Sequence, residues 1–287
     1  MATSHGAAVS HERLRRRFWE VLKYVVLILF LLIFLYPVFL VWSSALRDSA
    51  DIDLSPFALP LPPIWSNLAE AWTSGNFSRY VGNSVLYCTT IVTGVALVSS
   101  LAGYALAQMP VPGGNIILII FLLGVMVPFQ SIMIPLYYLL RDLHLLETYW
   151  AFILPAIALG LPFGIFLMRG FFRGLPVDLA DAGRVDGASE WRVFWSIMLP
   201  LAKPGLSTLV IVQFLATWNA FLMPLVFVQR DELRPVMLGM MFFSGRYTSD
   251  QGMIAAGVTI IMLPVVVLYL LLQRQFVQGI TAGAIRS

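Results

Sequence analysis

Long uninterrupted runs of apolar residues dominate the chain and determine the secondary structure that it predicts. Several of these runs approach about 20 residues, the length that an α-helix needs to cross the ~30 Å hydrocarbon core of a bilayer. They lie at 24–42, 84–107, 116–139, 148–168, 206–228 and 253–272. Because the runs are continuously apolar and do not alternate with a period of two, they indicate helices and not the strands of a barrel. The pattern predicts an all-α polytopic membrane protein with six transmembrane helices.

Composition leads to the same class. Apolar residues make up 59% of the 287 residues, and charged residues only 11%. In soluble globular domains about a quarter of the residues are charged, so this chain has too little polar surface for a soluble domain of its length. Its one cysteine, Cys88, lies inside the second apolar run and has no intrachain partner for a disulfide.

The first apolar run has two interpretations. A basic segment precedes it, with Arg13, Arg15, Arg16, Arg17 and Lys23, as in a secretory signal peptide. The apolar core of a signal peptide spans about 7–15 residues, however, and this run is longer. We therefore predict an uncleaved transmembrane helix, with a cleaved signal peptide as the alternative.

The distribution of lysine and arginine predicts the orientation in the membrane. With six spans, both termini and the loop at 177–204 share one face, and this face carries twelve of the 18 basic residues. Basic residues favour the cytoplasmic side of a membrane. We therefore expect a cytoplasmic tail at 1–23, a permease domain at 24–273 and a cytoplasmic tail at 274–287. The net charge of +3 reflects this bias and is no evidence for nucleic acid binding.

The predicted spans carry neutral polar side chains and no ionisable ones in their cores. A carrier that couples transport to protons or sodium usually keeps an ionisable residue within the membrane. A neutral lining suits an uncharged, hydroxyl-rich solute, which needs hydrogen bonds and aromatic faces. Our candidates for a substrate pathway are Gln130, Gln213, Trp218 and Asn219. Alternatively, such residues only bond neighbouring helices.

The sequence lacks the motifs of common catalytic and nucleotide-binding sites. The chain has no phosphate-binding loop of the form G-x-x-x-x-G-K-[ST], and no cluster of histidine and cysteine residues. We therefore predict no catalytic residue, no metal site and no cofactor bound by this chain. The energy for transport would come from a separate protein.

The segment 177–204 is a long polar interruption between two apolar runs, and a membrane protein usually presents such a loop to a soluble partner. Gly187 suits a turn with positive φ between two short helices. Around this glycine, small side chains including Ala180 and Gly183 would be exposed and allow close approach of a partner. We assign partner coupling to Asp181, Ala182, Gly183, Asp186, Gly187, Ala188, Leu199 and Pro200. The alternative is an ordinary amphipathic interfacial helix.

The spacing in this loop resembles the EAA motif of ABC importer permeases. Asp181-Ala182-Gly183 is followed after three residues by Gly187, and after further spacing by Leu199-Pro200. Other points of likeness are Asn83-Ser84, Trp218-Asn219, Pro224 and the run Gly279-Ile280-Thr281-Ala282-Gly283-Ala284. Together they make the chain similar to the MalG-like carbohydrate ABC importer permeases, among the inner-membrane components of binding-protein-dependent transport systems. Two departures are Asp181 in place of the motif's glutamate and Gly183 in place of its second alanine.

The resemblance implies a permease fold of ABC importer type I, in the plasma or inner membrane of a prokaryote, with an EAA-type coupling loop on its cytoplasmic side. It also implies partners: a second homologous permease, a dimer of ATPase subunits that hold ATP and Mg, and an extracytoplasmic solute-binding protein. The implied solute is a sugar or oligosaccharide. The alternatives are a polyol or glycerol-phosphate-type solute, and a membrane scaffold without transport activity. An intramembrane enzyme is disfavoured because catalytic groups are missing.

Overall fold

A computed structural model describes residues 3–246 and 250–284 of the chain, and all of the regular elements within these residues are helices. The chain divides into two compact units. One consists of residues 1–70 and 247–259, and the other of residues 71–246 and 260–287. Each unit is described separately below.

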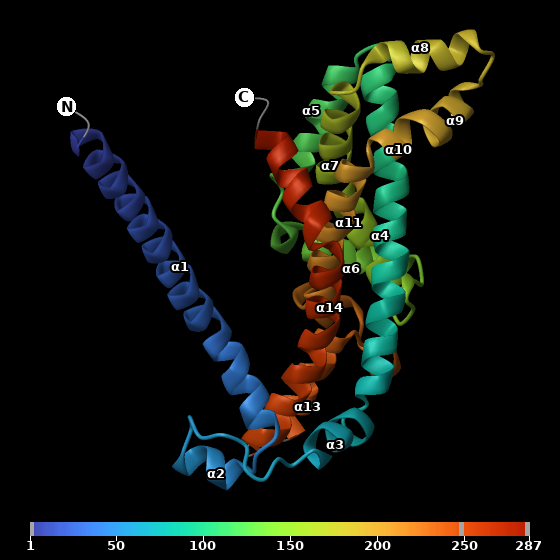
Figure 1. The fold of residues 1–287 in the computed structure, drawn as a ribbon. Coiled ribbons are helices and arrows are strands. Elements are labelled where there is room, and N and C mark those ends of the chain that lie inside the picture. The colour runs from blue at the N-terminus through green and yellow to red at the C-terminus, as the bar shows by residue number, and fades with distance from the viewer. Residues whose placement is uncertain (1–2, 247–249, 285–287) are drawn as a thin grey trace. The chain divides into compact units, whose positions relative to one another are not determined.

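The first unit is organised around a long N-terminal helix, α1 (Thr3–Ala45), drawn in blue in Figure 1. No residue in the most apolar stretch of this helix is buried within the chain, so its side chains suit a lipid environment. At its end, Asn67 Nδ2 donates hydrogen bonds to the carbonyl oxygens of Ala45 and Arg47, at 3.2 and 3.0 Å. The short helix α2 (Ser49–Leu54) follows, and α3 (Ser66–Ser74) leads towards the second unit.

Polar contacts hold the start of the last helix within the first unit. The last helix is α14 (Gln251–Ala284). Ser49 Oγ donates to Asp250 Oδ1 at 2.8 Å, and Gln251 Nε2 donates to Asp53 Oδ1 at 2.6 Å. Segments about 200 residues apart in the sequence are thus bonded to each other at one end of the unit.

The second unit holds the remaining elements, and Figure 1 labels most of its helices. They are α4 (Phe77–Gln108), α5 (Gly114–Val125), α6 (Phe129–Asp142), α7 (Trp150–Arg173), α8 (Val177–Val185), α9 (Glu190–Val193), the π-helical turn η1 (Phe194–Met198), α10 (Leu199–Leu201), α11 (Lys203–Trp218), α12 (Leu222–Phe227), the 3₁₀ turn η2 (Asp231–Leu233) and α13 (Val236–Arg246).

Helices α4 and α7 pack along each other at small residues. Gly103 of α4 lies so close to α7 that a Cβ atom there would be 2.8 Å from the backbone nitrogen of Arg169. Gly164 of α7 lies against Ser99 of α4, where an added Cβ would be 2.9 Å from Ser99 Cβ. Small residues at such positions let helix backbones approach closely in membrane proteins, where association depends on van der Waals contact.

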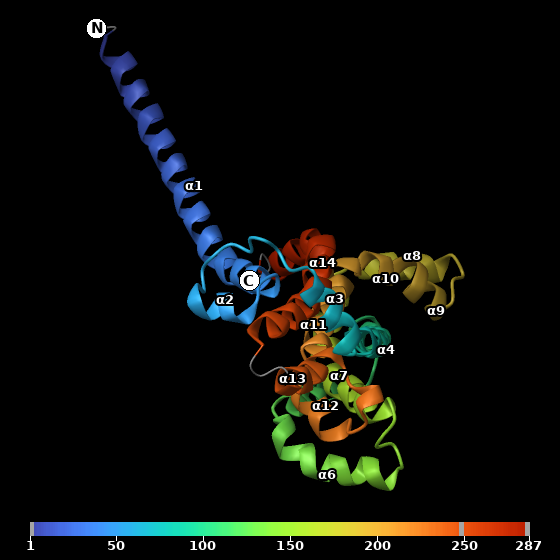
Figure 2. The same ribbon diagram turned by 90° about the horizontal axis from the view of Figure 1, so that it is seen from below.

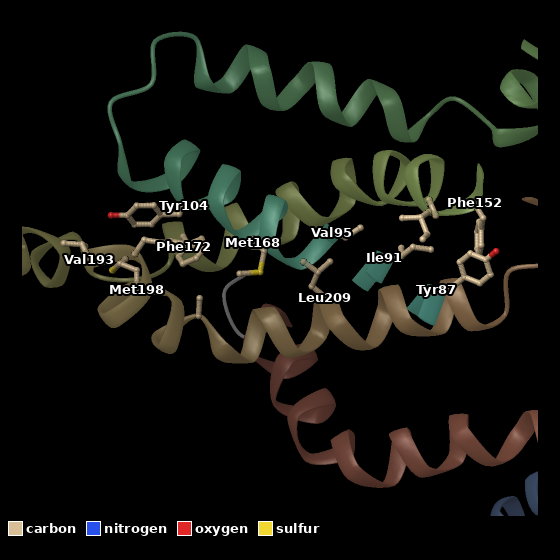
Figure 3. Close-up of a cluster of buried hydrophobic side chains, with 14 of the residues drawn as sticks. Tyr87, Ile91, Val95, Tyr104, Phe152, Met168, Phe172, Val193, Met198 and Leu209 are labelled. Carbon is tan, nitrogen blue, oxygen red and sulfur yellow. The ribbon is translucent and has the colours of Figure 1, made fainter. Parts of the chain in front are cut away.

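A row of buried side chains extends along α4 and joins it to its neighbours. Tyr87, Ile91 and Val95 follow one another at four-residue intervals and therefore share one face of the helix. Figure 3 shows this row, with Tyr87 packed beside Phe152 of α7 at one end and Tyr104 beside Phe172 at the other. Leu209 of α11 belongs to the same cluster, as do Val193 and Met198 of the polar loop. The loop therefore shares a core with the membrane helices.

Four of the predicted spans are confirmed as long helices. The runs 24–42 and 84–107 lie within α1 and α4, nearly all of the run 148–168 lies within α7, and nearly all of the run 253–272 lies within the apolar stretch Gln251–Leu271 of α14. Each of the four helices is long and apolar enough to cross a membrane. The expected tails at 1–23 and 274–287 continue the adjoining helices over their described residues, since α1 begins at Thr3 and α14 continues to Ala284.

The run 116–139, which was predicted as one span, is divided into two helices. Helix α5 ends at Val125, α6 begins at Phe129, and the two axes differ by 94°. Pro128 stands at the break in an extended conformation, with φ −66° and ψ 136°. Proline has no backbone N–H to donate and disfavours a helical conformation in the residue before it, which explains why the helix stops there.

The run 206–228, also predicted as one span, is likewise divided. Helix α11 ends at Trp218, and the short α12 begins only at Leu222. Asn219 ends α11, since its side-chain Nδ2 donates to the carbonyl oxygen of Leu215 at 2.9 Å. In the other direction, α11 forms a bent pair with the segment Glu190–Leu201, at 78°. The described residues thus contain four long spanning helices, or up to six spans if each bent pair counts as one.

The close contact at Gly103 makes a prediction about stability. Gly103→Ala should destabilise the protein by about 1–3 kcal/mol, because the new methyl group meets the backbone of α7 and cannot be accommodated by a rotamer change. The matched control is Gly82→Ala in the same helix, where nothing lies within 4 Å of the added atom. The control should be neutral or slightly stabilising, since alanine favours helix by up to about 1 kcal/mol over glycine. Thermal unfolding of both variants in detergent tests this, and equal melting temperatures would contradict the packing.

Candidate functional site

The polar loop at 177–204 forms a helical hairpin at one end of α4 and α7. After α7 ends, Pro176 introduces α8, with Asp178 in its first turn and Arg184 in its last. An acidic residue near a helix N-terminus and a basic one near its C-terminus both complement the helix dipole. Figure 2 shows α8, α9 and α10 projecting from the bundle on a different side from α6. The loop is therefore a structured projection of the second unit.

Gly187 makes the turn between the two arms of the hairpin, and the prediction of a positive φ there is confirmed. Its φ is +79°. The backbone nitrogens of Gly187 and Ala188 donate to the carbonyl oxygens of Arg184 and Gly183, both at 3.0 Å, and so close the end of α8. On the other side of the turn, Ser189 Oγ accepts a hydrogen bond from the backbone nitrogen of Arg192 and caps α9.

Arg184 connects the two arms electrostatically. Its Nε donates to Glu190 Oε1 and its Nη1 to Asp181 Oδ1, both at 2.6 Å. The second oxygen of Glu190 accepts a hydrogen bond from the hydroxyl group of Tyr104 at 3.0 Å. The bond from Arg184 holds the pKa of the Glu190 carboxyl below its ordinary value, and the hydrogen bond from Tyr104 lowers it further. Glu190 is therefore ionised at neutral pH, and it joins α8, α9 and α4.

The loop also packs through apolar side chains. Val193, Phe194 and Met198 are buried, and the ring of Phe194 lies 5.3 Å from that of Tyr104 and 6.3 Å from that of Phe172. Aromatic rings in such tilted arrangements attract one another beyond simple area burial. The hairpin is consequently held by both ionic and apolar contacts with the ends of α4 and α7.

Two of the small residues that we expected at the surface lie inside the hairpin instead. Ala180 is fully buried, and Gly183 is buried against Ile197, whose Cδ1 would be 2.6 Å from an added Cβ. The expectation that both would be exposed to a partner is therefore wrong. The reason is the helical period: residues three apart share a face of α8, and here this face packs against η1. The glycine that departs from the family motif fits this contact.

Several of the assigned coupling residues remain accessible. Asp181, Ala182, Asp186, Gly187 and Pro200 are exposed, whereas Ala188 and Leu199 are half-buried. Leu199 lines an apolar groove of about 330 Å³ together with residues of α4, η1 and α11. Two large apolar side chains beside these residues were not assigned from the sequence, since Val185 is 86% exposed and Trp191 is 61% exposed. Their apolar surface is available for contact with another protein, and aromatic residues such as Trp191 are enriched in such contacts.

The four candidates for the substrate pathway do not form one constellation. Gln130 is exposed in the first turn of α6, whereas Gln213, Trp218 and Asn219 belong to α11 or to its end. Gln213 Nε2 donates to Thr217 Oγ1 at 3.3 Å within α11. Asn219 is exposed, although its amide is used in ending the helix.

Trp218 has no free ring face. Only 1% of its surface is exposed, its ring stacks on Phe214 at 5.6 Å, and its Nε1 donates to the carbonyl oxygen of Ile261 at 3.3 Å. Trp218 therefore offers no ring face to a solute in this structure, because its side chain is used in packing α11. Gln213 and Asn219 keep accessible surface.

The sequence matches one protein-family model over residues 96–282, which include the whole loop and α11. The model describes the inner membrane component of binding-protein-dependent transport systems. This chain belongs to that family.

Two named relatives match most or nearly all of the chain. The diacetylchitobiose uptake system permease protein NgcG of Streptomyces coelicolor is 33% identical over 98% of this chain and 92% of its own length. The arabinooligosaccharides transport system permease protein AraQ of Halalkalibacterium halodurans is 35% identical over 85% of this chain and 86% of its own length. Both relatives are named as permease proteins of uptake or transport systems.

A solved structure shows the same fold. A chain of a bacterial ABC transporter involved in the import of the acidic polysaccharide alginate superimposes with a TM-score of 0.77. The match covers 91% of this chain and 97% of that chain, at 23% sequence identity. The predicted permease fold is thereby confirmed, and the chain is a multi-pass membrane component of a family of transport subunits.

Sequence reasoning missed the link between the loop and α4. Tyr104 and Glu190 are 86 positions apart, and no local pattern pairs them. A tyrosine near the end of an apolar run is usually assigned to the membrane interface, so its role as a donor to a loop carboxylate becomes visible only when α4 and α9 are placed side by side.

The turn at Gly187 makes a prediction about the loop. Gly187→Val should strain the turn, because a positive φ costs an L-residue roughly 1–2 kcal/mol even where space is available. We expect faster amide hydrogen exchange at 183–193 in the purified permease. The matched control is Gly170→Val, also at a position with nothing within 4 Å but without a positive φ. Equal exchange in the loop of both variants would show that the turn does not depend on glycine.

Proposed function

We propose that this chain is a permease subunit of an ATP-driven, binding-protein-dependent ABC importer for a sugar or oligosaccharide. The observation that carries the proposal is the hairpin at 177–204, which is prefolded, projects from the bundle and presents exposed acidic, small and apolar side chains. Family membership supports the transport role. The names of two relatives, which refer to diacetylchitobiose and arabinooligosaccharides, support the class of solute.

The hairpin is the proposed docking element for the ATPase subunits. Asp181, Ala182, Asp186 and Gly187 would contact the ATPase directly, together with the exposed Val185 and Trp191. Gly183, Ala188, Leu199 and Pro200 would act from within or beside the hairpin by setting its shape. Because ionic and apolar contacts already order the hairpin, docking would cost little conformational entropy. ATP and Mg would be held by the ATPase subunits and not by this chain.

The pathway would form between this chain and a second homologous permease. Apolar spans with exposed faces are available for this contact, and Gln213 and Asn219 are the remaining pathway candidates on α11, with Gln130 on α6. Their neutral side chains favour an uncharged solute. A solute of the glycerol-phosphate type is disfavoured, because its phosphate group is charged. An extracytoplasmic binding protein would deliver the solute.

The orientation follows from the distribution of basic residues, and it can be tested with single cysteines. On the proposed topology the hairpin and both termini are cytoplasmic, whereas residues 43–83 lie outside. In a Cys88→Ala background, Ser55→Cys should react with an impermeant thiol reagent added to intact cells. Ser189→Cys should react only after the membrane is opened. Both positions are exposed, so that access depends on the side of the membrane. Reaction of Ser189→Cys in intact cells would contradict the topology.

The energy source provides a second test. In proteoliposomes that contain the complex purified with its native partners, uptake of the sugar should require both ATP hydrolysis and the binding protein. Uptake should be insensitive to an uncoupler, because the sequences of the six predicted spans contain no Asp, Glu, Lys, Arg or His to couple an ion gradient. Gly187→Val should abolish uptake and weaken ATPase association, whereas Gly170→Val should preserve both. Uptake that continues without ATP and collapses with the uncoupler would refute the proposed function.

A further inference from the structure

Helix α4 is attached to other parts of the second unit by side-chain hydrogen bonds near both of its ends. Near its C-terminal end, Tyr104 donates to Glu190 of the hairpin at 3.0 Å, and Gln108 Nε2 donates to the carbonyl oxygen of Phe172 at 2.6 Å. Tyr104 is buried within the aromatic cluster of Phe172 and Phe194. A shift of the hairpin would therefore act directly on this end of α4.

The N-terminal part of α4 is bonded to the segment 231–236. Tyr80 OH donates to Asp231 Oδ1 at 2.8 Å, and Tyr87 OH donates to the carbonyl oxygen of Leu233 at 2.9 Å. Asn83 Nδ2 donates to the carbonyl oxygens of Glu232 and Arg234, at 2.8 and 3.0 Å. Ser84 Oγ accepts from the backbone nitrogen of Val236 at 2.8 Å. These side chains recur at three- and four-residue intervals and form one polar stripe on the helix.

The stripe is fixed from a second direction as well. Tyr149, at the start of α7, donates to Asn83 Oδ1 at 3.0 Å, so the amide group of Asn83 is bonded through both its oxygen and its nitrogen. Asn83, Ser84 and Tyr87 are all buried. Breaking such bonds leaves buried polar groups unsatisfied, which makes this attachment resistant to sliding.

Between these attachments α4 is continuous and has no internal proline. The three other long spanning helices of the described chain each contain at least one, namely Pro37 in α1, Pro155 and Pro162 in α7, and Pro264 in α14. Proline removes a helical hydrogen bond and introduces a kink or hinge. At 1.5 Å per residue, the 32 residues of α4 extend over about 48 Å. It is thus the helix best suited to move as one rod.

We propose that α4 transmits displacement of the coupling hairpin to the segment 231–236 at the opposite face of the membrane, with Tyr104 and Tyr87 as the positioning residues near its two ends. This inference rests on the proposed function, in which the hairpin is moved by ATPase subunits. On the proposed topology, 231–236 is extracytoplasmic, on the side from which a binding protein would deliver the solute. The cytoplasmic hairpin and this extracytoplasmic segment are then mechanically linked.

The test measures movement at the far end of α4 in the complex purified with its native partners. A spin label at Gln229→Cys, an exposed position two residues before η2, is introduced in a Cys88→Ala background. Label mobility is compared without nucleotide and after trapping with Mg·ATP and orthovanadate. We expect a change on trapping that Tyr104→Phe reduces at least twofold. The double variant Tyr80→Phe/Tyr87→Phe should also reduce it. All three changes remove only hydroxyl groups.

The controls separate transmission from general loosening. Tyr138→Phe removes a hydroxyl group from an exposed ring on α6 and should leave the trapped change as in the wild type. Glu190→Gln removes the charge of the carboxylate that Tyr104 contacts. It therefore weakens the hydrogen bond between Tyr104 and residue 190 from the other partner. Each variant is first shown to assemble with the ATPase subunits and to hydrolyse ATP, so that a reduced label response reports lost transmission and not lost docking.

The outcomes distinguish the two proposals. If the wild type responds and Tyr104→Phe responds equally, the role of α4 is refuted while the proposed function stands. If the wild-type complex assembles and hydrolyses ATP but the label does not respond, the role of α4 is refuted as well. If no ATPase subunit copurifies with the wild-type permease, the proposed function fails, and the inference built on it fails too.

Discussion

The contact between α4 and α7 is the interaction on which the rest of the second unit depends. It requires glycine at two places, because an added Cβ at Gly103 would meet the backbone of α7 and one at Gly164 would meet the side chain of Ser99 on α4. Within a bilayer, apolar side chains gain little by leaving lipid, so the close fit itself provides the attraction. This pair fixes the positions of Tyr104 and Phe172, which in turn form the base on which the polar hairpin is built.

The hairpin combines features that are usually found apart. It is polar and exposed on one side, as a docking element for a soluble protein must be, and on the other side it belongs to the same apolar core as the membrane helices. Isolated surface ion pairs contribute little to stability. Arg184 has a different importance, because its two acidic partners lie on different arms of the hairpin and one of them is also bonded to Tyr104. The charges here determine geometry more than stability.

Much of the fold could be predicted from the sequence because hydrophobic length is a direct physical requirement of a bilayer. The runs within α1, α4 and α7 were predicted for this reason. The positive φ of Gly187 was predicted for a different reason, because only a residue without Cβ adopts it readily. Hydropathy alone does not register the bends at Pro128 and Asn219, since apolar residues continue across both. The burial of Gly183 and Trp218 depends on partners at Ile197 and Ile261, and no local pattern identifies such partners.

The first helix is subject to a different kind of constraint. In its most apolar stretch no side chain is buried within the chain, so none is matched to a neighbour of fixed shape there. Each residue contributes mainly its own transfer free energy from water to lipid, and these contributions add with little regard to order. Exchanges among leucine, isoleucine, valine and phenylalanine should therefore be nearly neutral over this stretch during evolution, while the bonds that Asn67 makes at its end restrict change far more. Average hydropathy, and not a specific arrangement of side chains, is the property that selection would preserve in α1.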